Sequence, residues 1–149
     1  MTLVDVETHC EAPPDQVWAL LVDWERQARW LRADAVEAPS QPSGGVGARV
    51  RRHVRVVGPL TIATDLIVTE WVPPRRLGVR RDGRLVTGVG AFEIAPTDQG
   101  THVRWWEALA GPLGPLGGIA LGVLAPRLER DRRRALARFK ALSEAAGTR

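Results

Sequence analysis

The sequence predicts an α+β fold in which a curved antiparallel β-sheet wraps around one long C-terminal helix. Three observations predict it: most of the chain alternates apolar and polar residues with the period of a strand, two short helical segments follow the first strand, and the last part of the chain has helical periodicity. With 149 residues, the chain can bury one core but is short for two. We therefore expect a single domain over residues 1–149.

The N-terminal segment predicts one strand and two short helices. Residues 3–10 alternate apolar and polar side chains, which is typical of a strand with one solvated face. Pro13 and Pro14 are a helix start signal, and the apolar residues after them repeat at helical spacing. A second short helix is expected over residues 24–31.

Five further strands complete the predicted sheet. Each alternates apolar and polar residues, and together they occupy residues 46–56, 60–72, 77–81, 85–94 and 101–109. The Gly- and Pro-rich stretch 38–47 is expected to be a turn between strands, and Asp82-Gly83 is a favoured tight-hairpin signal. The sheet is therefore expected to be antiparallel.

The last predicted element is a long amphipathic helix. Pro126 lies inside its pattern, so it is expected to kink the helix or to mark where the firmly helical part begins. The amphipathic sheet needs a cover for its apolar face, and one helix meets a twisted sheet along only part of its length. We therefore expect an internal cavity between them, and the Gly- and Pro-rich segment 111–118 is either its lid or hinge or an ordinary loop. The apolar stripe of the helix comprises Leu121, Leu124, Leu128, Ala135, Phe139 and Leu142.

The positive charge of the chain comes almost wholly from arginine. The formal net charge is +4, the pI is near 10.8, and Lys140 is the only lysine. The abundance of Ala, Gly and Pro indicates codon bias, and no nucleic-acid-reading motif accompanies the charge, so we expect no nucleic-acid partner. The outward side of the final helix is either simply solvated or docks an acidic partner, such as an acyl carrier protein or an anionic membrane surface. Its arginines are Arg127, Arg130, Arg132, Arg133, Arg134 and Arg138.

Cysteine and histidine usage excludes several kinds of site. Cys10 is the only cysteine, which excludes an intramolecular disulfide and a cysteine-rich zinc site. The three histidines show no metal-ligand spacing, so no metal is expected. The N-terminus lacks a basic region followed by an apolar stretch, and no run approaches the roughly 20 apolar residues that span a bilayer. A cytoplasmic location without membrane insertion is expected.

Six motifs follow one another along nearly the whole chain. They are APPDQVW at 12–18, the helix 24–30, Gly47 at a strand start, TEWVPPRRL at 69–77, GTHV at 100–103 and the Arg- and Leu-rich final helix. Their order resembles the START-like (SRPBCC) helix-grip superfamily, and is most similar to its polyketide cyclase/dehydrase branch. The resemblance implies a helix-grip fold and a pocket for a small hydrophobic, polyketide-like molecule. Reaction type varies within the superfamily, so function must be argued from the site.

Arg52 and Glu107 interrupt the apolar faces of two predicted strands. Arg52 is in register with Val50, and Glu107 with Trp105. A buried charge is costly unless it is paired, and these two side chains can satisfy each other inside the cavity. They are either a structural or orienting ion pair or the catalytic residues, with Arg52 holding a carbonyl or enolate and Glu107 removing a proton.

The remaining candidates are expected to line the cavity as ligand-binding residues. Thr64 either positions a substrate oxygen or serves only the strand, where threonine is common. Glu70 shares a predicted face with Val68 and lies near a strand end, so it is expected at the rim. The full predicted lining is Trp30, Val50, Thr64, Leu66, Glu70, Trp105, Leu124 and Leu128.

Together, the residues and the resemblance predict a cyclase or dehydratase that performs aldol cyclisation or dehydration by acid–base chemistry. No cofactor is expected, because the carbonyl groups of such a substrate stabilise the carbanion. The alternative is a non-catalytic carrier or sensor of a lipid or similar molecule, which needs the same cavity without a charged pair. A third class is an interaction module that acts through the basic final helix.

Overall fold

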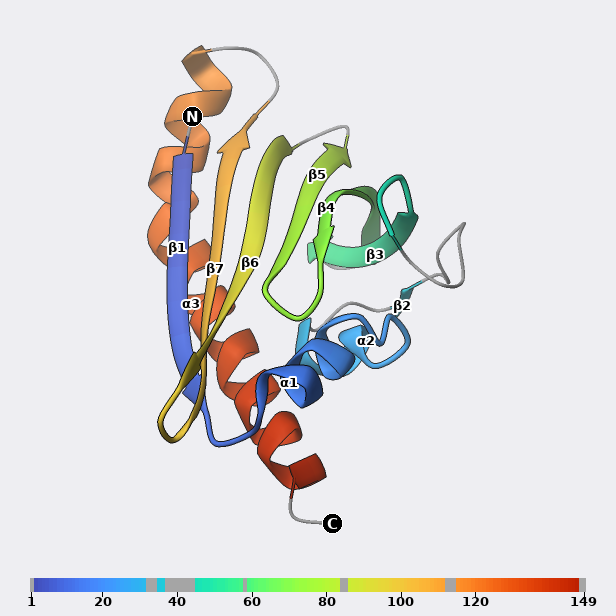
Figure 1. The fold of residues 1–149 in the computed structure, drawn as a ribbon. Coiled ribbons are helices and arrows are strands. Elements are labelled where there is room, and N and C mark those ends of the chain that lie inside the picture. The colour runs from blue at the N-terminus through green and yellow to red at the C-terminus, as the bar shows by residue number, and fades with distance from the viewer. Residues whose placement is uncertain are drawn as a thin grey trace.

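The computed structural model describes residues 2–31, 35–36, 45–57, 59–83, 86–111 and 115–147. The described residues confirm the predicted α+β helix-grip architecture, with two short helices after the first strand and a long helix at the C-terminal end (Figure 1). In chain order the elements are β1 (Thr2–Cys10), α1 (Pro14–Leu21), α2 (Gln27–Leu31), β2 (Ala35–Val36), β3 (Arg49–Val57), β4 (Leu60–Val72), β5 (Arg76–Gly83), β6 (Thr87–Thr97), β7 (Gly100–Ala110) and α3 (Pro115–Gly147).

The described strands form one antiparallel sheet in the order β1-β7-β6-β5-β4-β3-β2. Strands β2 to β7 follow one another across the sheet, and β1 returns to pair with β7 from Thr2 opposite Leu109 to Cys10 opposite Thr101. Figure 1 shows α3 running along the sheet beside β1, with α1 and α2 near its C-terminal half. The amphipathic sheet thus buries its apolar face against helices, as layer packing requires.

The two short helices pack against α3 and against one end of the sheet. α1 begins at Pro14, where proline costs no backbone hydrogen bond, and Asp15 in its first turn interacts favourably with the helix dipole. α2 contributes Trp30, which is fully buried. The buried side of α1 comprises Val17, Trp18, Leu20 and Leu21.

Four aromatic side chains fill the interior at this end. Trp30 makes edge-to-face contacts with Phe92, Trp105 and Phe139 at ring-centroid distances of 6.0, 6.1 and 5.0 Å. Phe92 and Trp105 are stacked at 4.8 Å. Because these residues come from α2, β6, β7 and α3, their contacts join the sheet to both helices.

Strand β4 changes the face of its side chains at Thr69. The register against β5 shifts between Val68 and Glu70, which makes Thr69 the extra residue of a β-bulge. Val68 is buried, whereas Glu70 is exposed and Trp71 packs against the core. The prediction that Glu70 shares the inward face of Val68 is therefore wrong, because the bulge moves the following residues to the opposite face.

Helix α3 is longer than its firmly predicted part. It begins at Pro115 and continues through Pro126 to Gly147. The predicted lid, segment 111–118, therefore includes the first turn of a helix, and its residues 112–114 lie outside the described residues. Residues 37–44 of the predicted turn also lie outside them.

Two of the six arginines predicted on the outward side of α3 turn inward. Arg132 reaches Glu107 under the sheet, and Nε of Arg138 donates a hydrogen bond to the backbone oxygen of Trp30 at 3.1 Å. The prediction is wrong for Arg132 because it lies four residues after Leu128, on the side of the helix that faces the sheet. It is wrong for Arg138 because its long side chain reaches the backbone of α2.

Candidate functional site

Several charged side chains are buried between the sheet and α3. Glu107 on β7 is 5% exposed, and Arg52 on β3 is 6% exposed. Along β7, buried and half-buried residues alternate, so Glu107 lies on the inner face together with Trp105 and Leu109. The inward position predicted for Glu107 and Arg52 from strand alternation is confirmed.

Two arginines hold the carboxylate of Glu107. Nη2 of Arg81, on β5, lies 3.2 Å from Oε2 and 3.4 Å from Oε1 of Glu107. Nη2 of Arg132, on α3, lies 3.4 Å from Oε1. The carboxylate therefore bridges the sheet and the helix through ionic contacts.

Arg52 has a neutral hydrogen-bond partner instead. Its Nη2 donates to Oε1 of Gln27 at 2.9 Å, and Nε2 of Gln27 donates to the backbone oxygen of Leu21 at 3.0 Å. The predicted mutual pairing of Arg52 and Glu107 is thus replaced by two separate sets of contacts. Gln27 fixes the orientation of Arg52. Neither of these two hydrogen bonds brings a carboxylate to the positive charge of Arg52.

The charged cluster consists of Glu107, Arg52, Arg81 and Arg132, together with Gln27, and its charges determine its protonation. Burial alone would raise the pKa of Glu107, but the charges of Arg132, Arg81 and Arg52 outweigh it and hold that pKa below its ordinary value of 4.5. Burial lowers the pKa of Arg52 well below its usual range, the charges of Arg81 and Arg132 lower it further, and Glu107 opposes them. A guanidinium starts so far above neutrality that Arg52 remains a cation, and Glu107 is an anion at neutral pH.

The neighbouring residues leave room for these side chains. Gly90 is opposite Glu107 in the sheet, and a Cβ there would come within 2.9 Å of Cγ of Glu107 and 2.6 Å of the backbone oxygen of Trp106. Only glycine permits this close approach. The guanidinium of Arg132 lies 4.7 Å above the ring of Trp105, a favourable cation–π contact.

Four buried N–H groups of the cluster and its surroundings have no acceptor among the described residues. They are Nε1 of Trp30 and the Nε atoms of Arg52, Arg81 and Arg132. Trp30 is connected to the charges through Trp105, which its ring contacts and over which Arg132 lies. Nearly all buried donors in proteins have a partner, so these four can donate to the oxygen atoms of a bound molecule.

Most of the predicted ligand-binding residues of the sheet lie on its inner face. Trp30 on α2 and Val50, Leu66 and Trp105 on the sheet are buried, and Thr64 is half-buried, two residues before Leu66 on the same strand. Glu70 is the exception, because of the bulge described above. That the inward residues contact a ligand stays a prediction.

The two predicted residues of α3 differ from each other. Leu128 is half-buried and packs against Val4 and Leu109. Leu124, one turn earlier, is 47% exposed. The structure places Leu124 at the surface, contrary to the prediction, because the N-terminal part of α3 extends beyond the packed part of the sheet (Figure 1).

Three members of the cluster are absent from the predicted site: Gln27, Arg81 and Arg132. Arg81 is two residues after the buried Val79, so strand alternation puts both on the same face of β5. Arg132 is four residues after Leu128, so helical periodicity puts both on the same side of α3. Periodicity therefore contained a signal for both arginines. Gln27 had no comparable signal, because its role depends on the position of α2 against β3.

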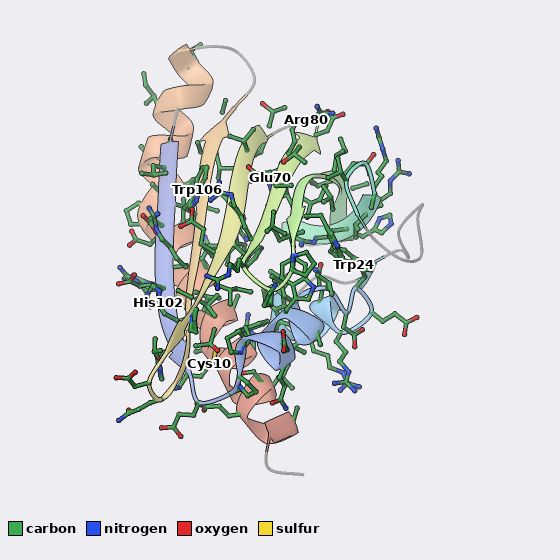
Figure 2. The ribbon with its side chains drawn as sticks, in the orientation of Figure 1. Cys10, Trp24, Glu70, Arg80, His102 and Trp106 are labelled. Carbon is green, nitrogen blue, oxygen red and sulfur yellow. The ribbon has the colours of Figure 1, made fainter. Side chains whose placement is uncertain are left out.

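A second carboxylate–guanidinium network lies on the outer face of the same sheet. Glu93 on β6 is paired with Arg76 on β5 and, at 3.3 Å, with Arg104 on β7. Nε1 of Trp106, labelled in Figure 2, donates to Glu93 at 3.2 Å. Arg104 extends the network to Asp5 on β1 at 2.7 Å. This network contains the same kinds of group as the inner cluster, a carboxylate between guanidiniums, but it is in contact with solvent.

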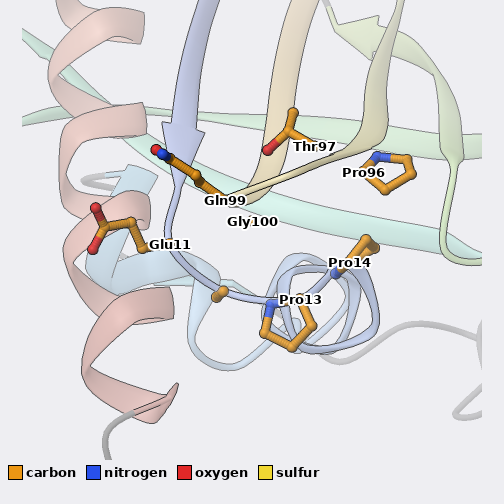
Figure 3. A pocket seen from close by; sticks show the side chains of 8 residues that line it. Glu11, Pro13, Pro14, Pro96, Thr97, Gln99 and Gly100 are labelled. Carbon is orange, nitrogen blue, oxygen red and sulfur yellow. The ribbon is translucent and has the colours of Figure 1, made fainter.

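Two hollows lined by described residues lie at the surface. The larger, of about 340 Å³, lies between the start of α1 and the turn from β6 to β7, where Pro13, Pro96 and Gly100 line it (Figure 3). The smaller, of about 240 Å³, is lined by Pro14 and Pro74 among others. Neither is lined by a predicted catalytic or ligand-binding residue, so the predicted internal cavity stays a prediction argued from the buried cluster.

Other kinds of site find little support in the described part of the chain. There, no three His, Cys, Asp or Glu side chains gather closely enough to hold a metal ion. Cys10 is buried, and burial raises the pKa of its thiol, which makes it a poor nucleophile. None of the helices that can be described is both long and apolar enough to cross a membrane.

Comparison with known sequences gives one family. A family model described as "Polyketide cyclase / dehydrase and lipid transport" matches residues 1–144. No curated protein sequence matches the chain.

Solved structures share the whole architecture at low sequence identity. TTHA0849 from Thermus thermophilus is 19% identical, with a TM-score of 0.78 over 97% of this chain and 99% of that one. The Zhui aromatase/cyclase from Streptomyces sp. R1128 is 21% identical, with a TM-score of 0.75 over 96% and 93%. SA2116 from Staphylococcus aureus, a protein of unknown function, is 11% identical, with a TM-score of 0.78 over 99% and 96%. At these identities the likeness shows the fold alone.

Proposed function

Because the chain belongs to the polyketide cyclase/dehydrase and lipid-transport family, we propose that it binds a small hydrophobic, polyketide-like molecule between the sheet and α3 and catalyses its aldol cyclisation or dehydration. The observation that carries this proposal is the buried, ionised Glu107 among the guanidiniums of Arg52, Arg81 and Arg132. Such a cluster supplies a carboxylate base and cations for a developing oxyanion, which are the groups that this chemistry needs.

In the proposed reaction, Glu107 takes a proton from a carbon next to a carbonyl group of the substrate. The resulting enolate oxygen is held by the guanidiniums, and the enolate carbon attacks a second carbonyl carbon of the same molecule to form the new C–C bond. The alkoxide produced takes the proton back from Glu107. Loss of this hydroxyl group with a neighbouring hydrogen, as water, completes a dehydration, and the reaction consumes no cofactor.

The guanidiniums are expected to contribute more to the rate than the base. A pKa below 4.5 makes the Glu107 carboxylate a weak base, whereas fixed cations shielded from water stabilise an enolate strongly. Arg52 is the best candidate to touch the substrate oxygen, because its hydrogen bond goes to the neutral amide of Gln27. Gln27 is then a positioning residue.

The test uses an aryl-substituted diketone whose two carbonyl groups are separated by three methylene groups. Its intramolecular aldol condensation gives a conjugated cyclohexenone that can be followed by ultraviolet absorbance. We expect wild-type protein to accelerate this reaction, and Arg52→Met and Glu107→Gln each to lower kcat/KM by about 100-fold or more.

Glu93→Gln is the matched control. It makes the same chemical change to a carboxylate that also lies between two arginines, but on the outer face. Circular dichroism establishes that each variant is folded. Equal activity of Glu107→Gln and Glu93→Gln, with both folded, would contradict the proposed catalytic site.

A non-catalytic carrier is the second candidate function. It is favoured by the two ionic contacts of Glu107, which are also what a purely structural carboxylate would make. A carrier binds the diketone without accelerating product formation. Binding measured by tryptophan fluorescence, compared with turnover in the same samples, separates the two functions.

A further inference from the structure

We propose that the molecule bound beneath the sheet is a hydrophobic carboxylic acid, held as its anion by Arg52, Arg81 and Arg132. This inference rests on the proposed function, because it identifies the class of molecule that the proposed site binds. It argues against a neutral chain joined to a carrier protein as a thioester, which has no carboxylate at that end.

The balance of buried charge is the first argument. The cluster contains the three guanidiniums and the single carboxylate of Glu107, which leaves a net of two positive charges among the described side chains. Asp131 also acts on Arg132, but it is exposed, so water screens its charge. Burying unbalanced charge is unfavourable, and a bound anion lowers the imbalance.

The second argument is the set of unpartnered donors. The Nε atoms of Arg52, Arg81 and Arg132 and Nε1 of Trp30 are buried without an acceptor in the described part of the chain. Arg52 itself is only 6% exposed. Guanidinium groups present their N–H bonds in a planar fork that matches the two oxygens of a carboxylate. Arg81 and Arg132 already give one nitrogen each to Glu107, so their Nε groups remain for a second carboxylate.

The third argument is the apolar surroundings, which select a hydrophobic body for the anion. Trp105 and Leu109 flank Glu107 on the inner face of β7, and both are buried. Val50 and Leu66 are buried on β3 and β4. The charged side chains therefore lie among apolar ones, and such surroundings favour an acid with an aromatic or alkyl body over a small inorganic anion.

The test compares naphthoate with naphthamide by isothermal titration calorimetry at neutral pH. The two probes have nearly the same shape and differ in charge. We expect naphthoate to bind at least about tenfold more tightly than naphthamide, and Arg81→Gln to reduce this ratio to about threefold or less. Arg76→Gln changes an arginine of the same strand that pairs with a carboxylate on the outer face, and it should leave the ratio unchanged.

The outcomes separate this inference from the proposed function. Equal binding of the acid and the amide would overturn the inference and leave the hydrophobic site standing. Binding of neither probe would contradict the site itself, and the inference with it.

A second measurement does not depend on the probe. In ligand-free protein, Arg81→Gln removes one excess buried charge and leaves Arg132 on Glu107, so we expect its Tm to rise by about 3 °C. A fall in Tm as large as that of Glu107→Gln would mean that the cluster is balanced without an anion, and would overturn the inference.

Discussion

Glu107 and Glu93 are two carboxylates in similar surroundings on opposite faces of one sheet. Each lies between two guanidiniums from two other elements, and the pKa of each is lowered although burial opposes the change. The side chain of Glu107 is 7% exposed, whereas that of Glu93 is 35% exposed. Ion pairs of the same kind are therefore shielded from water around Glu107 and in contact with water around Glu93.

This difference in solvation makes the inner arrangement the candidate for a function. At the outer face, water and salt screen the charges, so the network of Glu93 needs no explanation beyond a solvated surface. At the inner face, removing three guanidiniums and a carboxylate from water costs free energy that their mutual attraction only partly offsets. The inner cluster is therefore the better candidate for binding and catalysis.

The largest expected difference between the two faces concerns the adjacent tryptophans. Trp105 is 2% exposed, stacks on Phe92 and lies under Arg132, whereas Trp106 is half-buried on the outer face. We expect Trp105→Ala to lower the free energy of unfolding by about 4 kcal/mol, and Trp106→Ala by about 1 kcal/mol. Urea unfolding followed by circular dichroism measures both, and similar losses would show that the inner face is not the core.

The carboxylates themselves should differ next. We expect Glu107→Leu to destabilise the protein by about 3 kcal/mol, because it leaves buried guanidiniums without their anion. Glu93→Leu should cost less than about 1 kcal/mol, as exposed ion pairs do. The comparison would fail if the two substitutions had equal cost in the same urea titration.

The pH dependence provides a smaller and more specific difference. The pKa of Glu107 is lower in the folded protein than its ordinary value of 4.5, so its ionisation adds stability above that value, and this stability is lost as the pH falls toward the folded pKa. We expect the stability gap between wild type and Glu107→Gln to shrink below pH 4.5, even in about 1 M salt. The corresponding gap for Glu93→Gln should be nearly absent in that salt. A gap for Glu107 that disappears on adding salt at neutral pH would show that water reaches the cluster.

The smallest expected change in the free energy of unfolding concerns α3, at the point where the helix stops packing against the sheet. Leu124 is 47% exposed, and Leu128 is half-buried against Val4 and Leu109. We expect Leu124→Ala to change the free energy of unfolding by less than about 0.5 kcal/mol, and Leu128→Ala to lower it by about 1 kcal/mol. A larger effect at Leu124 would indicate that the first turns of α3 are covered in solution.

Strand periodicity predicted the inner face well where the pairing is regular. Glu107 lies in an unbroken alternation along β7, and Arg52 lies before any irregularity in β3, so their inward positions could be derived from the sequence. Glu70 could not be placed correctly, because the bulge at Thr69 depends on how β4 pairs with β5. The apolar–polar alternation of the sequence does not show where such a bulge occurs.

The contacts within the cluster were beyond what periodicity can predict. It gives the face of Arg81 and Arg132, but not that both reach Glu107 while Arg52 turns to Gln27. Those pairings depend on the placement of α2 and α3 against the sheet, which is set by packing between segments far apart in the chain. The exposure of Leu124 has the same origin, since its apolar stripe is continuous with that of the buried part of the helix.

The most direct test of a ligand site beneath the sheet uses the indole N–H signals of the six tryptophans in a proton–nitrogen correlation spectrum during titration with naphthoate. The signals of Trp30, whose indole N–H is buried without an acceptor in the described structure, and of Trp105 should shift, whereas that of Trp106 on the outer face should stay in place. A shift of Trp106 without Trp30 and Trp105, or no shift at all, would contradict a binding site between the sheet and α3.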